Sequence, residues 1–390
     1  MFDELDQVPW STLEHAYGDA GDIPDLIRAL VSSDPDEREQ AQDMLDMGPF
    51  HQESLYSCTP FVVRCLMQLA QEPDMYDKPW LLQYISRVLA SALYHLPDPE
   101  MLVLAPEELL LEPEEMYAKQ IVLEIQPRLR QLLRLIYDSD ALVRLAALRL
   151  LVMMDADLPD LGRVLSDRLA AETEAQIRSA LTFCLGLLAD RDMLARIVET
   201  LGDVTESLLV RIAAGFSVIA VSNERLPDNV VASFCAVIAD NYDALDDFED
   251  VYAEYLTPLG APRGKDRLLE CLPNNLSTHQ KNQIILALQH IYAQLPTSAS
   301  VGIRIGSGYY LNTMVRLAFP QGKLAPETTI HDLTDTQRGI LEAFQKYDMP
   351  AVSWNVYHSS DYRTVLGFSF RSETDFLDFM SGKRSARETK

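Results

Sequence analysis

The segment HQESLYSCTPFVV, which starts at His51, brings together side chains that could do chemistry. His51, Tyr56 and Cys58 lie within eight positions of one another. An imidazole close to a thiol could activate the sulfur as a nucleophile, or both could bind a metal ion. A nucleophilic thiol needs a cationic neighbour that lowers its pKa, and Cys58 has none nearby. The catalytic hypothesis is therefore weak for this segment.

The same segment has the features of a joint between two helices. Gly48 and Pro49 would end one helix, and Thr59 and Pro60 would start the next, with proline in the first turn. Polar side chains between them, including His51, can bond the unpaired backbone groups of both helix ends. We favour this structural interpretation over a catalytic or metal site.

Other chemical motifs are missing from the sequence. The seven histidines form no HxxxH or HExxH pair, and the five cysteines form no CxxC pair. The glycines of GIRIGSGYY are spaced GxxxGxG, which indicates a turn and not a nucleotide-binding loop. There is no GxSxG motif. We expect no enzymatic activity, no metal and no cofactor.

Charge is the most unusual bulk property. The 390 residues include 33 Lys and Arg and 59 Asp and Glu, giving a formal net charge of −26. Such a surface repels phosphate backbones and attracts basic proteins, so we expect no nucleic acid among the partners. The odd number of scattered cysteines, the acidic N-terminus and the charges that interrupt every apolar run predict a cytoplasmic protein without membrane contact.

Three segments repeat one helical pattern: DALVRLAALRLL, EAQIRSALTFCL and ESLLVRIAAGFS. The repeated positions are Val143, Arg144 and Ala146; Ile177, Arg178 and Ala180; and Val210, Arg211 and Ala213. The arginines are 34 and 33 positions apart. Small alanines permit close helix packing, and stacked helical pairs bury faces that no pair can bury alone. The repeat predicts an α-solenoid.

These segments resemble the HEAT-like repeat, including the type found in bacterial lyase-like proteins. The N-terminal part resembles an uncharacterised family of bacterial HEAT-repeat proteins at His15–Gly18, His51, Gln52, Tyr56 and Thr59. The similarity covers about residues 10 to 235, and LTDTQRGILEAF followed by Trp354 is similar to the end of such proteins. The resemblance implies a fold more than a function, because helical solenoids serve many partners.

The predicted fold is all-α: a right-handed α-solenoid of HEAT-like helical pairs over residues 1–296, with a small, mixed α+β C-terminal cap over 297–380. Residues 97–116, rich in proline and acids, are expected to form an inserted loop. SVGIRIGSGYY, AVSWNVY and TVLGFSF have β character and account for the mixed cap. Residues 381–390 are expected to be a mobile tail.

Acidic runs are the candidate partner-binding sites. The run DNYDALDDFEDVYAEY contains no basic residue, and a second group lies in the loop 97–116. The candidate residues are Asp240, Asp243, Asp246, Asp247, Glu249, Asp250, Tyr252, Glu107 and Glu108. One interpretation is a patch for a basic partner, in which acids attract and tyrosines anchor. The alternative is a solvated helix face, because Phe248, Tyr252 and Tyr255 fall on one helical stripe that could enter the core.

Arg144, Arg178 and Arg211 could line a groove for an anionic ligand, but the acidic balance favours internal salt bridges.

The function predicted is a non-enzymatic binding scaffold, specifically an acidic immunity or inhibitor protein that captures a basic toxin or effector. The net charge and the family resemblance motivate the prediction of an immunity or inhibitor protein. A phycobilin-lyase-type enzyme or chaperone of a small anionic ligand is the alternative, and a helical-repeat DNA glycosylase is a third, disfavoured by charge.

Overall fold

The computed structural model describes residues 2, 4–96, 112–154, 158, 160–188, 191–221, 226–239, 241–252, 256, 276–294, 310, 313–319, 324–325, 327–347 and 373–386. These residues are predominantly helical, which confirms the all-α prediction. The chain divides into two compact units, Met1–Ile177 (unit 1) and Arg178–Lys390 (unit 2). In the described ranges, no helix combines the length and the apolar character needed to cross a lipid bilayer.

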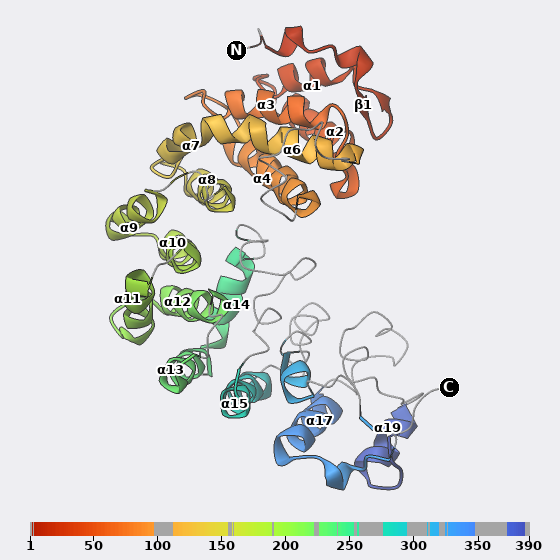
Figure 1. Ribbon diagram of the computed structural model, residues 1–390, viewed down its shortest axis with the longest axis vertical. Coiled ribbons are helices and arrows are strands. Elements are labelled where there is room, and N and C mark those ends of the chain that lie inside the picture. Colours follow the sequence, from red (N-terminus) through yellow and green to blue (C-terminus); the bar gives the residue numbers. More distant parts are fainter. Residues whose placement is uncertain are drawn as a thin grey trace. The chain divides into compact units, whose positions relative to one another are not determined.

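Unit 1 contains a short β-hairpin that follows two 3-10 helices and precedes a series of α-helices (Figure 1). The strands are β1 (Glu14–His15) and β2 (Gly18–Asp19). The α-helices are α1 (Ile23–Ala29), α2 (Pro35–Met47), α3 (Thr59–Leu69), α4 (Lys78–His95), α6 (Pro113–Ile125), α7 (Leu129–Leu135), α8 (Ala141–Met153) and α9 (Leu161–Ala171). Short 3-10 helices cover Leu5–Gln7, Trp10–Thr12, His51–Glu53 and Gln126–Arg128.

Helix starts in unit 1 follow from local sequence. The Asp34 carboxylate accepts the N–H of Asp36 at the start of α2, and the Asp140 carboxylate accepts that of Leu142 at the start of α8. Proline occupies the first turn of α1, α2, α3, α4 and α6, where its missing N–H costs nothing.

One boundary differs from the sequence prediction. Residues 113–116, assigned to the inserted loop, are the first turn of α6. The Glu115 carboxylate accepts the N–H of Glu112 at 2.8 Å, so the acids that suggested a loop instead cap the helix. Residues 97–111 lie outside the described ranges.

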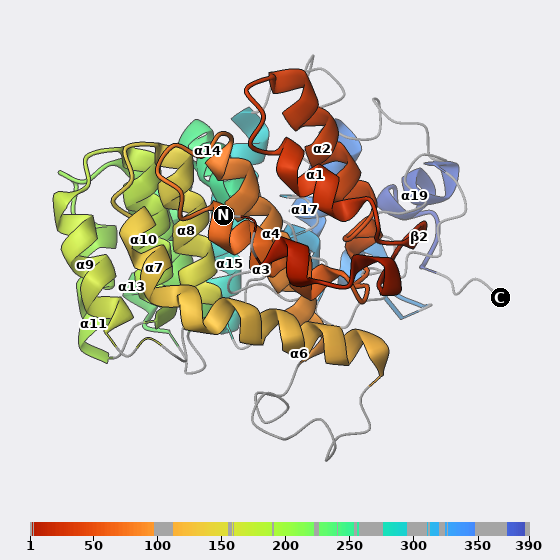
Figure 2. The ribbon, with the colours of Figure 1, turned by 90° about the horizontal axis from the view of Figure 1, so that it is seen from above.

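The core of unit 1 lies where α3, α4 and α6 meet. Helix α6 runs across both α3 and α4 (Figure 2). Val62, Leu66, Ile85, Leu89 and Ile121 are fully buried there. Each large apolar side chain taken out of water in this way contributes roughly 1.5–3 kcal/mol.

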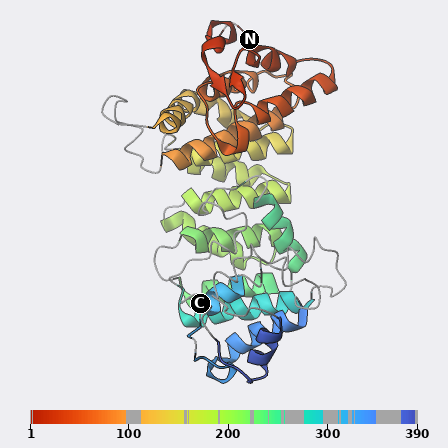
Figure 3. The same cartoon turned by 90° about the vertical axis from the view of Figure 1, so that its right-hand side faces the viewer.

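Unit 2 begins within α10 (Ala175–Leu188), since the boundary between the units falls after Ile177. Its other helices are α11 (Arg191–Gly202), α12 (Leu208–Val221), α13 (Asp228–Ala239), α14 (Tyr242–Val251), α15 (Thr278–Gln294), α17 (Asp335–Tyr347) and α19 (Glu373–Met380). The 3-10 helix Ile330–Asp332 precedes α17. Helix α12 packs against α11, α13 and α14, and α13 packs against α15 (Figure 3, green to cyan).

Aromatic rings fill the centre of unit 2. Phe216 of α12 contacts Phe234 of α13 edge-on, with ring centroids 5.0 Å apart, and stacks on Phe248 of α14 at 5.9 Å. All three side chains are at most 2% exposed. Gly215 permits this packing, because a Cβ there would lie 2.3 Å from Phe234 Cδ2.

The predicted C-terminal cap remains a prediction. SVGIRIGSGYY, AVSWNVY and TVLGFSF lie almost entirely outside the described residues. The described part beyond residue 297 contains α17, α19 and a 3-10 helix, and none of it is a strand.

Candidate partner-binding surface

The N-terminal hairpin displays one aromatic side chain at its tip. β1 and β2 pair antiparallel, with His15 opposite Gly18, so that Ala16 and Tyr17 form the two-residue turn. Gly18 has φ +127°, a conformation that residues with a Cβ rarely adopt. Tyr17 is 62% exposed, which points its ring away from the core.

Contacts from distant segments hold this hairpin in place. Ala16 N–H donates to the carbonyl of Gly48 at 3.2 Å, just after α2. On the other side, Glu14 N–H donates to Ser57 Oγ at 2.8 Å, and the Glu14 carbonyl accepts from Cys58 N–H at 3.4 Å. The hairpin is therefore tied both to the end of α2 and to the start of α3.

His15 has a structural role in the turn. Its Nδ1 accepts the N–H of Tyr17 at 3.0 Å, which leaves the ring proton on Nε2. That Nε2–H is directed at Asp22 Oδ1, 3.2 Å away. Tyr17 in turn contacts the ring of His51 edge-on, with centroids 5.6 Å apart. The two histidines thus take part in packing and turn formation.

The segment from Pro49 to Pro60 has the geometry expected of a helix joint. Thr59 Oγ1 donates to the carbonyl of Pro49 at 2.6 Å and accepts the N–H of Tyr56 at 2.9 Å. Gln52 and Glu53 have φ values of 52° and 65°, and the Ser91 hydroxyl donates to the Glu53 carbonyl at 2.7 Å. These contacts support the structural interpretation of the His51 segment.

The four cysteine thiols that the structure describes lack the electrostatic setting of a nucleophile. Burial raises the pKa of Cys58, Cys65 and Cys235 to about 12, and it raises the pKa of Cys184 further. All four are free and buried. Among the described residues, no group of three or more His, Cys, Asp or Glu side chains could hold a metal ion.

Helix α14 carries most of the predicted acidic patch, and the structure separates its residues into two faces. Asp243, Asp247 and Asp250 are exposed and Asp246 is half-buried, whereas Phe248 is in the core. The side chains of Asp240 and Glu249, and all of Glu107 and Glu108, lie outside the described part.

Tyr252, which the sequence placed among the partner contacts, is fully buried. Its ring meets Phe183 edge-on, with centroids 5.6 Å apart. This placement corrects the prediction for Tyr252, because a side chain held in the core is not accessible to a partner. The helical spacing of Tyr252 and Phe248 had indicated this alternative, in which both side chains enter the core.

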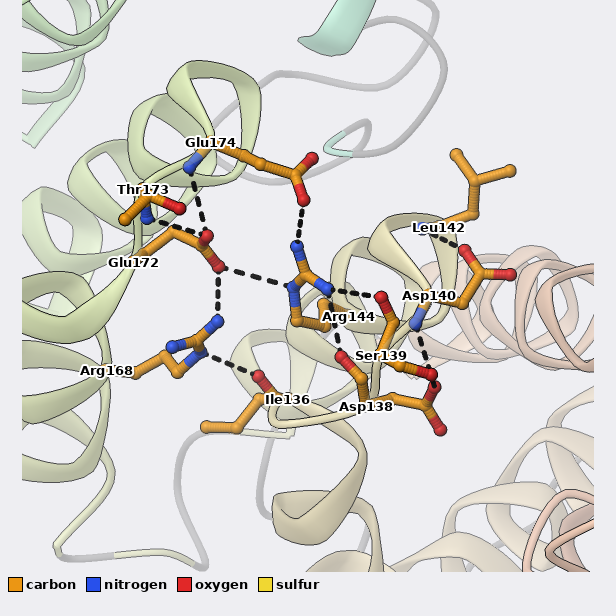
Figure 4. Close-up of polar contacts among 10 residues, drawn as sticks. All are labelled: Ile136, Asp138, Ser139, Asp140, Leu142, Arg144, Arg168, Glu172, Thr173 and Glu174. Carbon is orange, nitrogen blue, oxygen red and sulfur yellow. Dashed lines mark hydrogen bonds and ion pairs between the residues drawn. The ribbon is translucent and has the colours of Figure 1, made fainter.

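Two of the three repeat arginines, Arg144 and Arg178, form internal ion pairs. Arg144 is 7% exposed in its side chain and lies between two carboxylates of the loop before α10: Nη2 is 2.7 Å from Glu174 Oε1, and Nε is 3.3 Å from Glu172 Oε2 (Figure 4). Its Nη1 donates to the carbonyls of Asp138 and Ser139 at 2.9 and 3.0 Å.

Glu172 is the centre of this network. Burial opposes its ionisation, but the N–H groups of Glu174 and Thr173 and the charges of Arg168 and Arg144 outweigh that cost and lower its pKa. The Arg168 guanidinium also donates to the Ile136 carbonyl at 2.9 Å, which ties α9 to the end of α7 (Figure 4).

The next two repeats use their arginines similarly. Arg178 pairs with Glu206, in the loop before α12, and Arg211 Nε donates to the Leu201 carbonyl at 3.1 Å. The contacts of Arg144 and Arg178 agree with the internal salt bridging that the acidic balance predicted, whereas the contact of Arg211 is a hydrogen bond to a backbone carbonyl. The guanidinium groups of Arg144 and Arg178 are engaged by this chain's own carboxylates.

Sequence reasoning did not single out Met44 and Met47, which are 41% and 48% exposed near the end of α2. The helical spacing of α2 nevertheless indicates their exposure, since Ala41 and Leu45 form the buried stripe and the methionines lie beside it.

Comparison with protein-family models, curated proteins and solved structures found no significant match for this chain.

Proposed function

We propose that the chain is a non-enzymatic, HEAT-like α-solenoid that binds a basic partner protein, in the manner of an immunity or inhibitor protein that captures a cationic toxin or effector. Support for the solenoid comes from the repeated arginine. In α8 and again in α10, this residue pairs with a glutamate in the loop that precedes the next repeat. Such nearest-neighbour ties are how stacked helical pairs are held together.

The observation that carries the binding proposal is the distribution of charge in unit 1. The sequence has only two lysines before residue 178, Lys78 and Lys119, and both are buried. The first 77 residues contain 17 Asp and Glu and three Arg. Each of the three is in an ion pair: Arg28 with Asp6 and Asp25, Arg38 with Asp77, and Arg64 with Glu124.

Exposed carboxylates therefore dominate the described surface of these first 77 residues, whereas α7 in the same unit exposes Arg130 and Arg134. A field of one sign speeds encounters with oppositely charged proteins and discourages encounters with other acidic ones. Two observations favour binding over catalysis among the described residues: the four described cysteines are buried as protonated thiols, and His15 is engaged in hydrogen bonds of the hairpin turn.

The test has two stages. Immobilised protein is exposed to extract of the native host at about 50 mM salt, bound proteins are eluted with a salt gradient, and a basic protein is identified by mass spectrometry. The purified candidate is then mixed with the protein in a stopped-flow instrument. Association should slow at least about tenfold between about 20 and 300 mM salt. If the candidate is an enzyme, complex formation should inhibit it.

Charge-reversal variants show which acidic residues attract the basic partner. Asp243→Lys with Asp247→Lys should slow association, whereas Asp167→Lys with Glu199→Lys makes the same change in net charge on other exposed helix faces. Equal slowing by both variants would indicate attraction by the overall field. Salt-independent association, or elution of a small anionic ligand with no basic protein, would contradict the proposed function.

A further inference from the structure

A compact apolar and aromatic surface lies in unit 1 where the hairpin meets the end of α2. We call it the Tyr–Met patch, and it consists of Tyr17, Met44, Met47 and His51. Met44 and Met47 are one turn apart on the last turn of α2. The residue after Met47, Gly48, accepts the hydrogen bond of Ala16, next to Tyr17, and the Tyr17 ring contacts His51.

Three of these side chains are exposed, and the fourth, His51, is half-buried. Tyr17 is 62% exposed, Met47 48% and Met44 41%. Aromatic residues and methionine are the residue types enriched in the centres of protein interfaces. Methionine side chains in addition adapt to partners of different shape, since they are unbranched and polarisable.

The elements that carry the Tyr–Met patch also carry exposed acidic side chains. Exposed carboxylates of Glu14, Asp19, Asp43 and Glu53 belong to the same hairpin, helix and turn that carry the patch. Arginines close to these elements are paired with acids: Arg38 Nε lies 2.7 Å from Asp77 Oδ2, and Arg87 of α4 pairs with Asp46 in the last turn of α2. An apolar centre with a rim of one charge is complementary to a segment that has apolar and basic side chains together.

The hairpin also holds Tyr17 in position before any partner arrives. The bonds of Ala16 to Gly48, of Glu14 to Ser57 and Cys58, and of His15 to the Tyr17 N–H fix the backbone on both sides of the ring. A partner would therefore lose little conformational entropy in ordering this anchor, which favours affinity.

We propose that the Tyr–Met patch is the docking site for a basic, amphipathic segment of a partner protein: its apolar residues cover Tyr17, Met44 and Met47, and its Lys or Arg side chains meet the acidic rim. This inference rests on the proposed function and assigns it a site, on a different part of the chain from the acids of α14. The apolar contacts would provide the slow dissociation that surface charges alone do not give.

The test uses the full chain and two fluorescent peptides of equal charge. One is an amphipathic 18-residue peptide of Lys and Leu at helical spacing, and the other has Ser in place of each Leu. Fluorescence anisotropy at about 150 mM salt should show the Lys/Leu peptide binding at least about tenfold more tightly than the Lys/Ser peptide, because only the former covers the apolar centre.

Variants assign the site. Tyr17→Ser with Met47→Ser should weaken binding of the Lys/Leu peptide about tenfold or more and leave binding of the Lys/Ser peptide unchanged. Met116→Ser with Leu123→Ser is the matched control, since these side chains of α6 are 40% and 49% exposed in the same unit. All four positions are exposed, so thermal unfolding should be the same for both variants.

Three results would overturn the assignment: no binding of the Lys/Leu peptide, equal loss in both variants, or a concentration-dependent dimer that Tyr17→Ser with Met47→Ser abolishes, which would make a second copy the occupant. In none of these cases is the salt-dependent capture of a basic protein affected, so failure of the site and failure of the proposed function are distinguishable. If the protein still captures a basic partner but the Tyr17→Ser with Met47→Ser variant binds the Lys/Leu peptide as the wild type does, the acids of α14 become the candidate binding site.

Discussion

Glu172 joins Arg144 of α8 and Arg168 of α9 in one buried ion-pair network. Its side chain is 3% exposed and lies 3.3 Å from Arg144 Nε, and it also pairs with Arg168. A buried ion pair repays the cost of its desolvation only when its remaining hydrogen bonds are made, and here the N–H groups of Thr173 and Glu174 make them at 2.9 and 3.1 Å.

We expect Glu172→Gln to lower the free energy of unfolding at pH 7 by roughly 1–3 kcal/mol, because two arginines lose their shared charged acceptor. The folded-state pKa of Glu172 is lowered. Its contribution is therefore complete above the unfolded pKa of about 4.3 and is lost as pH falls through the folded-state value.

Urea unfolding of the wild type and of Glu172→Gln between about pH 3 and 8 measures how the difference in unfolding free energy depends on pH. The difference between wild type and Glu172→Gln should shrink on acidification. Glu174→Gln is the control and should cost less, since that carboxylate is 54% exposed. A wild-type advantage that persists unchanged at the lowest pH would contradict the lowered pKa.

The buried thiols give a second prediction at this scale. Because burial raises the pKa of Cys58 to about 12, its thiolate is scarce at pH 8. In a Cys271→Ser variant, Ellman's reagent should label no cysteine of the native protein quickly and all four after denaturation. One thiol that reacts natively at the rate of free cysteine would restore the nucleophile hypothesis for the segment that contains it.

At the scale of elements, glycines set how closely the helices of unit 2 approach. A Cβ on Gly186 of α10 would lie 2.3 Å from Ser217 Cβ of α12. We expect Gly186→Ala to destabilise the protein by roughly 1–3 kcal/mol, because overpacking exceeds the gain of up to about 1 kcal/mol in helix propensity. Thermal unfolding followed by circular dichroism measures the change.

Gly202→Ala is the matched control for this contact. Its Cβ would meet nothing within 4 Å, so the substitution should leave stability unchanged or raise it slightly. Similar destabilisation by both substitutions would mean that the close approach of α10 and α12 is not the cause.

The helices were predictable where one local pattern determined them. Arg144, Arg178 and Arg211 marked α8, α10 and α12 because the same spacing of apolar residues recurs around each. The start of α6 was not predicted, since Pro113 and its neighbouring acids also suit a loop. Nor was the hairpin, whose two-residue strands depend on bonds to Gly48 and Cys58, distant in sequence.

The candidate surfaces were predictable to a smaller extent. Composition identified the acids of α14, but not which aromatic neighbours are buried, because Tyr252 and the exposed Tyr17 are the same residue type in different packing. Exposure of Met44 and Met47 depends on how α2 packs, which single-sequence patterning constrains only through the buried stripe of Ala41 and Leu45.

At the scale of the whole molecule, the net charge of −26 has a cost that internal ion pairs offset only in part. Like charges across the surface repel one another and destabilise the folded state, and salt screens that repulsion over a Debye length of about 10 Å at 0.1 M. The ion pair of Arg144 with Glu172 is buried and that of Arg178 with Glu206 is partly buried, so salt screens both less than it screens exposed charges.

We therefore expect NaCl to stabilise the protein, with the midpoint of thermal unfolding rising by about 2–5 °C between about 10 and 300 mM salt. Differential scanning calorimetry at pH 7.5 would measure it. Asp243→Asn with Asp247→Asn, which removes two exposed charges from α14, should reduce the rise. A midpoint that falls as salt is added would mean that attraction within the ion-pair network outweighs repulsion. The unbound protein would then have no excess charge repulsion for a basic partner to relieve, and the electrostatic case for capture would lose its thermodynamic basis.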